Sequence, residues 1–181
     1  DNLNRLTRVQ DPVANRVTYT FASNGNLLTL TQEETGNGGT SYTTYASPFE
    51  YDALDRLTKS IDPLSKETTF AYDPRGNVTQ VQDPNGNKVF SEYDELNRKT
   101  KLLVEYSGTN TLTTRWEFDN NDRLTKVYDG KSQATSFAYD ALDRQISTSY
   151  ADSGAITWAY DLNSNVIERV GRQIELHRVS R

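Results

Sequence analysis

A short motif returns along almost the whole chain at a nearly constant interval. Each copy is an aromatic residue, usually followed by Asp, then two variable residues, a Gly, Asn, Asp or Ser, and an Arg or Asn. Successive aromatic positions are 30, 21, 21, 25, 21 and 21 residues apart and are Phe21, Tyr51, Tyr72, Tyr93, Phe118, Tyr139 and Tyr160. A truncated copy opens the chain at Asp1. A fixed period of this size predicts a repeat array, in which each unit buries its apolar surface only against its neighbours.

The residues that lead into each repeated aromatic have the pattern of a β-strand. Thr68, Phe70 and Tyr72 alternate with other residues, and a period of two is typical of a strand with two unlike faces. We therefore expect the aromatics of all repeats to share one face. The stretch after the motif, such as residues 78–81, predicts a second strand that ends at Asp-Pro or Asp-Gly. Each unit should thus be two antiparallel strands of about 6–9 residues.

The fourth residue after each aromatic is predicted to have a positive φ, as in a short hairpin loop made of a type I turn and one left-handed residue. Gly, Asn and Asp tolerate that conformation best. The Asp after the aromatic can accept backbone N–H bonds in the turn, and it can pair with the Arg four residues later, as Asp52 with Arg56. The positions predicted to have a positive φ are Gly25, Asp55, Gly76, Asn97, Asp122, Asp143 and Ser164.

The residues that define the motif are assigned a structural role in the array. We expect no catalytic, cofactor-binding or metal-binding residues. The aromatic rows are interpreted as a packing ladder, with platforms for stacking sugars as the alternative. The residues that define the repeats are Tyr51, Asp52, Arg56, Tyr72, Asp73, Gly76, Tyr93, Asp94, Arg98, Phe118, Asp119, Arg123, Tyr139, Asp140, Arg144, Tyr160 and Asp161.

Three places depart from the regular pattern. In the other repeats a second aromatic stands two residues before the motif aromatic, as Phe70 does before Tyr72. Before Tyr93 this position is Ser91, and Phe90 lies beside it, so we expect a bulge or local register shift there. The two longer intervals contain Gly-rich and Ser-rich stretches at residues 33–45 and 106–111. Insertions in repeat proteins map to surface loops, so both stretches are predicted to be long hairpin loops.

Composition excludes several classes of protein. Hydrophobic residues make up 34% of the chain and the mean hydropathy is -0.79, which favours a sheet with one wet face over a closed core. The net charge is -5 with no basic stripe, so nucleic acid is not expected as a partner. No apolar run predicts a membrane span. The chain lacks Cys and Met, and we interpret residues 1–181 as a single array that is a fragment of a longer chain.

The sequence offers little for catalysis. The one histidine, His177, lies in a stretch that reads as a strand, and an enzyme would have to use it with Glu175 or Asp161. Residues 83–87 and 161–165 have the opening spacing of a calcium loop but lack its required Gly and Glu. We therefore predict no enzyme and no cofactor.

The motif Tyr-Asp-x-x-Gly/Asn/Asp-Arg/Asn-Leu, repeated at 21 residues, resembles the YD repeat, also called the RHS repeat. That family includes bacterial Rhs polymorphic toxins, components of insecticidal toxin complexes, wall-associated bacterial proteins and animal teneurins. The resemblance implies a long β-ribbon that spirals into a hollow shell, which in the bacterial toxins encloses a C-terminal toxin polypeptide. Such shells usually close with a self-cleaving segment built on Asp-Pro-x-Gly. The nearest matches here, at Asp73 and Asp83, are interpreted as ordinary repeat turns.

The sequence thus predicts an all-β fold of about 14–16 strands, a curved antiparallel strip of a larger β-shell with about two strands per 21-residue repeat. The predicted function is a wall segment of an Rhs or toxin-complex shell, secreted or at the bacterial cell surface, with a toxin polypeptide as its enclosed partner. The sheet edges should bind the rest of the shell or further copies, since unpaired edges invite association. A glycan-binding or adhesion module is the alternative.

Overall fold

The computed structural model describes residues 1–35, 42–108 and 110–171, which form strands and turns without a helix. Within these residues, no helix is long and apolar enough to cross a membrane. The strands are β1 (Arg8–Gln10), β2 (Arg16–Phe21), β3 (Leu27–Thr35), β4 (Tyr42–Tyr51), β5 (Leu57–Ile61), β6 (Glu67–Tyr72), β7 (Val78–Gln82), β8 (Lys88–Tyr93), β9 (Lys99–Tyr106), β10 (Asn110–Phe118), β11 (Leu124–Tyr128), β12 (Ala134–Tyr139), β13 (Gln145–Ser149), β14 (Ala155–Tyr160) and β15 (Val166–Gly171).

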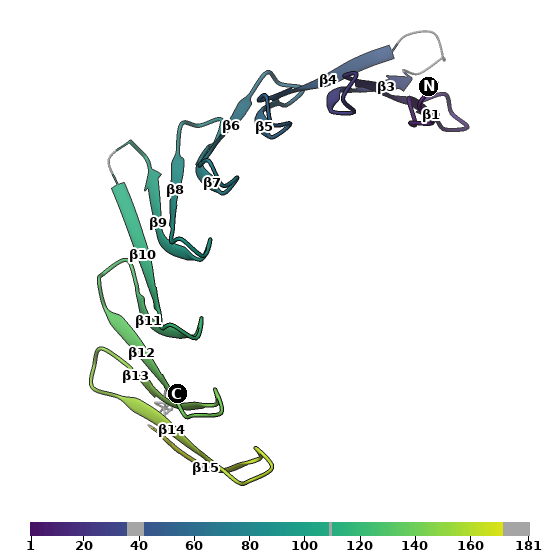
Figure 1. Ribbon diagram of the computed structural model, residues 1–181. Coiled ribbons are helices and arrows are strands. Elements are labelled where there is room, and N and C mark those ends of the chain that lie inside the picture. The colour runs from purple at the N-terminus through teal and green to yellow at the C-terminus, as the bar shows by residue number, and fades with distance from the viewer. Residues whose placement is uncertain (36–41, 109, 172–181) are drawn as a thin grey trace, which may run out of the picture. The chain divides into compact units, whose positions relative to one another are not determined.

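The strands follow one another in the sheet in the order of the chain, from β1 to β15 (Figure 1). Neighbours such as β6 and β7 pair antiparallel, because each strand is joined to the next by a short turn. The all-β fold and the predicted strand number are confirmed for the described residues. In four repeats the second strand is shorter than predicted, with five residues in β5, β7, β11 and β13, whereas β3, β9 and β15 have the predicted length with nine, eight and six residues. The curvature of the strip stays a prediction.

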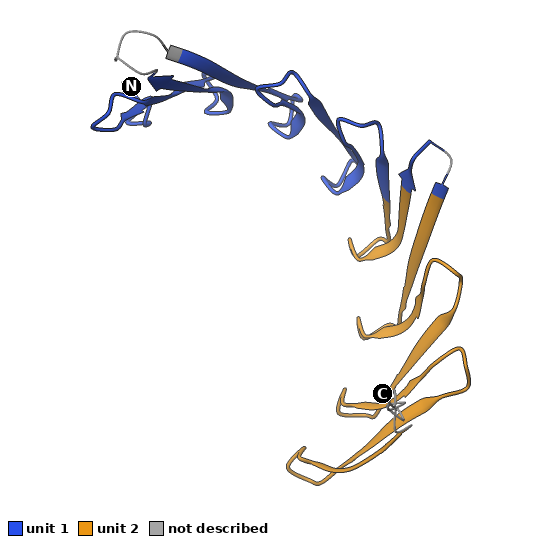
Figure 2. Cartoon of the chain, turned by 180° about the vertical axis from the view of Figure 1, so that it is seen from behind, with its two compact units in different colours: residues 1–90, 105–110 blue, residues 91–104, 111–181 orange. Residues whose placement is uncertain are grey.

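The chain divides into two compact units, shown in different colours in Figure 2. Unit 1 comprises residues 1–90 and 105–110, and unit 2 comprises residues 91–104 and 111–181. Both units are built from the same hairpin repeat, so each can be described by itself.

One face of each unit carries the repeated aromatics. In unit 1, Phe70 lies opposite Val81 and Tyr72 opposite Val78, so the second strand fills the space between aromatic rows. The registers place Tyr51 and Tyr72 on one face of unit 1, and Tyr139 and Tyr160 on one face of unit 2. The shared face predicted for the aromatics is therefore confirmed within each unit. We call it the aromatic face.

The opposite face is polar and carries cross-strand ion pairs. Lys59 Nζ lies 3.3 Å from Glu50 and 3.6 Å from Glu67, which stand on the two neighbouring strands. Among the described residues no hydrophobic side chain is fully buried, and Thr148 is the one polar residue that is, with 5% of its surface exposed. The sheet is thus a single layer whose aromatics are half-buried by their neighbours, as the low hydrophobic content predicted.

The register shift predicted at Phe90 is absent from the β7–β8 pairing. Gln80, Val81 and Gln82 pair regularly with Phe90, Val89 and Lys88, which puts Phe90 on the polar face. Bulges occur instead beside the motif turns, for example between Ala71 and Tyr72. The left-handed turn residue produces this bulge. The two stretches predicted to be long loops are partly strand: β3 runs to Thr35 and β4 begins at Tyr42, while β9 runs to Tyr106 and β10 begins at Asn110. The Gly-rich centre of the first stretch lies outside the described residues.

Candidate functional site

The defining residues of the motif meet at one kind of turn. In the turn at residues 52–56, the Asp55 N–H donates to the Asp52 carbonyl and the Asp52 N–H donates to the Arg56 carbonyl. We call such turns, which carry the motif, the repeat turns: residues 1–5, 22–26, 52–56, 73–77, 94–98, 119–123, 140–144 and 161–165. The same backbone bonds close the other ends of the strands. These return turns are residues 11–15, 62–66, 83–87, 129–133 and 150–154.

The predicted left-handed residues are confirmed in the repeat turns. The φ of Asp55 is 62° and that of Gly76 is 91°. A positive φ also occurs in the return turns, as at Ser65 with 61°. The remaining predicted positions with a positive φ are Gly25, Asn97, Asp122, Asp143 and Ser164.

In the turns that open with Asp, this residue caps the loop. Asp52 Oδ1 accepts the backbone N–H groups of Leu54 and Arg56 at 2.9 and 3.0 Å. In the return turn, Asp62 Oδ1 accepts those of Leu64 and Lys66 at 2.8 and 2.9 Å. One carboxylate thus satisfies two backbone donors, which fixes the loop. This geometry explains why Asp recurs at both ends of the strands.

The Arg of a repeat turn reaches further than its own turn. Arg56 Nε donates to Asp52 Oδ2 at 2.7 Å, while its Nη1 donates to the Asp73 carbonyl of the next repeat turn at 2.9 Å. Its guanidinium also lies over the Tyr72 ring, 4.6 Å from the centroid. We call this set of contacts the forward clamp. It recurs at Arg5, Arg98, Arg123 and Arg144, over Phe21, Phe118, Tyr139 and Tyr160.

The motif Tyr points back to the repeat before it. The Tyr72 hydroxyl donates to the Leu57 carbonyl at 2.7 Å. The Tyr139 and Tyr160 hydroxyls make the same bond to the Leu124 and Gln145 carbonyls. Each such Tyr therefore lies under the Arg of the preceding repeat and bonds to the strand that follows that Arg.

Acidic residues at the left-handed position extend the clamp. Arg98 and Arg123 each donate to a carboxylate in the next repeat turn, that of Asp122 and Asp143 respectively, at 2.7 Å. A left-handed conformation costs a non-Gly residue free energy, and this bond offsets part of that cost. The motif predicted a pairing of Asp and Arg within one turn, but the contact between turns was missed. A signal was present, because an aromatic follows each Arg by 16 residues, or by 20 at the longer interval.

The turn geometry lowers the pKa of the capping carboxylates. The side-chain bond from Arg56 holds the pKa of Asp52 below its ordinary value of 3.8, and Arg144 does the same for Asp140. Where the turn ends in Asn, the side-chain amide lowers the pKa of Asp73 and Asp161. These carboxylates are thus ionised at neutral pH as acceptors of fixed bonds.

The contacts of the turn residues hold the strands and turns of the array together. No group of three or more metal-ligating side chains occurs within residues 1–35, 42–108 and 110–171. The two calcium-like stretches are ordinary turns, in which Asp83 and Asp161 bond to the side chains of Asn87 and Asn165. His177 and Glu175 lie outside the described residues.

The fold and its turns define a class of repeat protein, and the family comparison agrees. Residues 51–88 and 118–155 match the family model described as RHS Repeat. The resemblance to the RHS-repeat family that the motif indicated is thus confirmed over these two stretches of the chain.

Two curated relatives are both named as toxins. The chain is 29% identical over 140 residues to Toxin protein Tse5 of Pseudomonas aeruginosa, a match that covers 76% of this chain and 10% of that protein. It is 30% identical over 128 residues to Double-stranded DNA deaminase toxin A of Burkholderia cenocepacia, covering 62% of this chain and 9% of that one. The chain therefore spans about a tenth of the length of these relatives.

Solved structures share the fold. The crystal structure of TcdB2-TccC3 without its hypervariable C-terminal region matches with a TM-score of 0.57 and 12% identity, covering 94% of this chain and 11% of that one. The structure of TcdB2-TccC3-Cdc42 matches with a TM-score of 0.51 and 11% identity over the same shares. At this identity the likeness shows a common fold.

Proposed function

We propose that residues 1–181 form one RHS-repeat array that serves as a wall segment of a shell, in a bacterial protein of the Rhs or toxin-complex type that encapsulates a C-terminal toxin polypeptide. The observation that carries this proposal is the forward clamp. It ties each repeat to the next one only, so the wall can be lengthened by adding repeats. The names of the relatives and the small share of their length that is matched support a structural part of a larger toxin. The protein would be secreted or lie at the cell surface, and this segment would have no enzymatic role.

The partners of this segment would bind at the two ends of the sheet. β1 and β15 are the first and last strands in the sheet order, and an outermost strand presents backbone donors and acceptors to a further strand. In the larger protein, other repeats of the same shell would cover them. Expressed alone, the chain should associate through these edges. Light scattering that shows a stable monomer at high concentration would count against the proposal.

Encapsulation is tested on the complete polypeptide that contains this segment. In limited proteolysis, the region after the shell should be cleaved about tenfold more slowly in the unsubstituted polypeptide than in a variant with Arg98, Arg123 and Arg144 each changed to Ala. The variant should be cleaved faster because its weakened clamps let the wall open. A purified C-terminal region serves as the unprotected control. Equal cleavage rates in the intact polypeptide and this control would refute encapsulation.

A further inference from the structure

One return turn of unit 2 lacks the capping carboxylate. Tyr150 stands at the position that Asp129 holds in the preceding return turn, where Asp129 Oδ1 accepts the Lys131 and Gln133 N–H groups at 2.9 and 2.8 Å. The backbone bonds of the turn at residues 150–154 are unchanged. Asp152 Oδ1 instead accepts the Gly154 N–H at 3.0 Å. The fold of the turn does not call for a Tyr, and departures from a local rule often mark functional positions.

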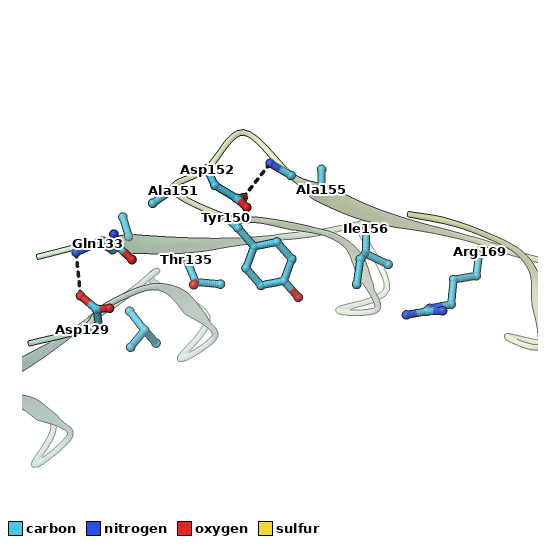
Figure 3. A pocket seen from close by; sticks show the side chains of 12 residues that line it. Asp129, Gln133, Thr135, Tyr150, Ala151, Asp152, Ala155, Ile156 and Arg169 are labelled. Carbon is cyan, nitrogen blue, oxygen red and sulfur yellow. Dashed lines mark hydrogen bonds between the residues drawn. The ribbon is translucent and has the colours of Figure 1, made fainter. Parts of the chain in front are cut away.

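Tyr150 borders a recess on the aromatic face of unit 2. Thr135 pairs with Val127, and Ile156 pairs with Thr148, which places these side chains on one face. The recess has a volume of about 610 Å³, within the range of about 300–1,000 Å³ that is usual for ligand sites. Figure 3 shows the Tyr150 ring lying across its centre between Thr135 and Ile156. Tyr150 is 43% exposed and can contact a ligand.

The two ends of the recess differ in charge. Arg169 extends toward Ile156 from one end, and Asp129 lies at the other (Figure 3). Arg169 is exposed, and it forms no ion pair with any residue that the structure describes. The turn arginines of the aromatic face, such as Arg144, are by contrast paired with carboxylates. An apolar floor with an aromatic wall and one available guanidinium suits an apolar group attached to a carboxylate.

We propose that this recess binds an extended polypeptide segment, through an apolar side chain held against Tyr150 and Ile156 and an adjacent acidic side chain bound by Arg169. The choice of a polypeptide over a small molecule rests on the proposed function, because an enclosed polypeptide would lie against the wall at high local concentration. The site departs from the regular wall and gives the enclosed chain a fixed point of contact.

The test uses the fluorescence of Trp158, which pairs with Arg169 across β14 and β15. In the Trp116→Phe chain it is the sole tryptophan. The probes are the acetylated, amidated tripeptides Leu-Leu-Glu, Leu-Leu-Gln and Leu-Leu-Lys. Leu-Leu-Glu should give a saturable change, and Leu-Leu-Gln should bind at least about fivefold more weakly, since it lacks the charge-assisted bond. Calorimetric titration of the unsubstituted chain repeats the comparison without Trp116→Phe.

Two variants separate binding from folding. Arg169→Gln should weaken the binding of Leu-Leu-Glu to the level seen for Leu-Leu-Gln. Tyr150→Asp restores the regular cap, so it should keep or raise the thermal midpoint while it weakens binding of Leu-Leu-Glu at least about fivefold. Equal binding of the three tripeptides, or unchanged binding by Tyr150→Asp, would overturn the inference. So would acetate or butyrate that binds as tightly as Leu-Leu-Glu. A complete polypeptide whose C-terminal region is protected, while the tripeptides fail to bind, would refute this site and leave the proposed function standing.

Discussion

The repeat turns and the return turns of unit 1 have the same backbone hydrogen bonds, but their side chains make different contacts. In the turns at 52–56 and 62–66, an Asp caps the loop through two N–H groups and a residue with a positive φ completes it. The last residue of the repeat turn at 52–56 is Arg56, which contacts Asp73 and Tyr72 of the next repeat. The last residue of the return turn at 62–66 is Lys66. The comparison teaches that turn formation and cohesion between repeats are carried by different residues.

Acidification should have the largest effect, because it acts on several repeat turns together. The pKa values of Asp52, Asp73, Asp140 and Asp161 are lowered in the folded chain. Their contribution to stability is present above the unfolded pKa of 3.8 and is lost as the pH falls through the folded pKa. Thermal unfolding followed by circular dichroism should show a steep fall in midpoint below about pH 4.

The control for acidification removes two of these groups. A chain with Asp52→Asn and Asp140→Asn should start from a lower midpoint at neutral pH and lose less of it on acidification. An acid-induced loss equal to that of the unsubstituted chain would show that general charge repulsion dominates.

Among single substitutions in the turns, Arg56→Ala should be the most harmful, because it removes the pair with Asp52, the bond to Asp73 and the stacking on Tyr72 together. We expect the thermal midpoint to fall by roughly 5 °C. The matched control is Lys66→Ala in the return turn, which should lower it by no more than about 1 °C. Equal losses in the two variants would contradict the division of roles between the turns.

Tyr72→Phe should have a smaller effect. It keeps the ring beneath Arg56 and removes only the hydroxyl bond to the Leu57 carbonyl. The free energy of unfolding should fall by about 1 kcal/mol, measured by urea denaturation. For Tyr51 the structure shows no matching bond among the described residues, so Tyr51→Phe should be nearly neutral. Equal losses from both changes would argue against the hydroxyl bond as a link between repeats.

The smallest effect is expected at the left-handed residue of a return turn. Ser65 has a φ of 61°, and Ser65→Gly should raise the free energy of unfolding by about 0.5 kcal/mol, as relief of the backbone exceeds the added entropy of the unfolded chain. Gly76→Ala should act in the opposite direction, since Gly76 has a φ of 91° and an added Cβ would meet no other atom, so that only the backbone strain acts. Urea denaturation of both variants checks the two signs.

The sequence predicted those features of the fold that depend on residues close together in the chain. The alternation before Tyr72 indicated a strand, and the Gly, Asn and Asp at fixed places indicated left-handed turn residues, because both signals act within a few positions. The contacts of Arg56 with Asp73 and Tyr72 join residues 17 and 16 positions apart, and only the strand register brings them together. The shift expected at Phe90 is absent from the β7–β8 pairing, since a strand accepts an aromatic on its polar face without a bulge. The recess beside Tyr150 likewise needed the arrangement of three hairpins.

The forward clamp also sets the distances along the chain over which folding contacts must form. Arg56 reaches a carbonyl 17 residues ahead, and Tyr72 reaches one 15 residues behind. Large antiparallel sheets usually require contacts between distant segments, which slows folding. Here each repeat needs only the one synthesised just before it, so the sheet can grow in step with the ribosome from its N-terminal end. In an array of any length, each added repeat therefore folds by forming contacts over the same short distance along the chain.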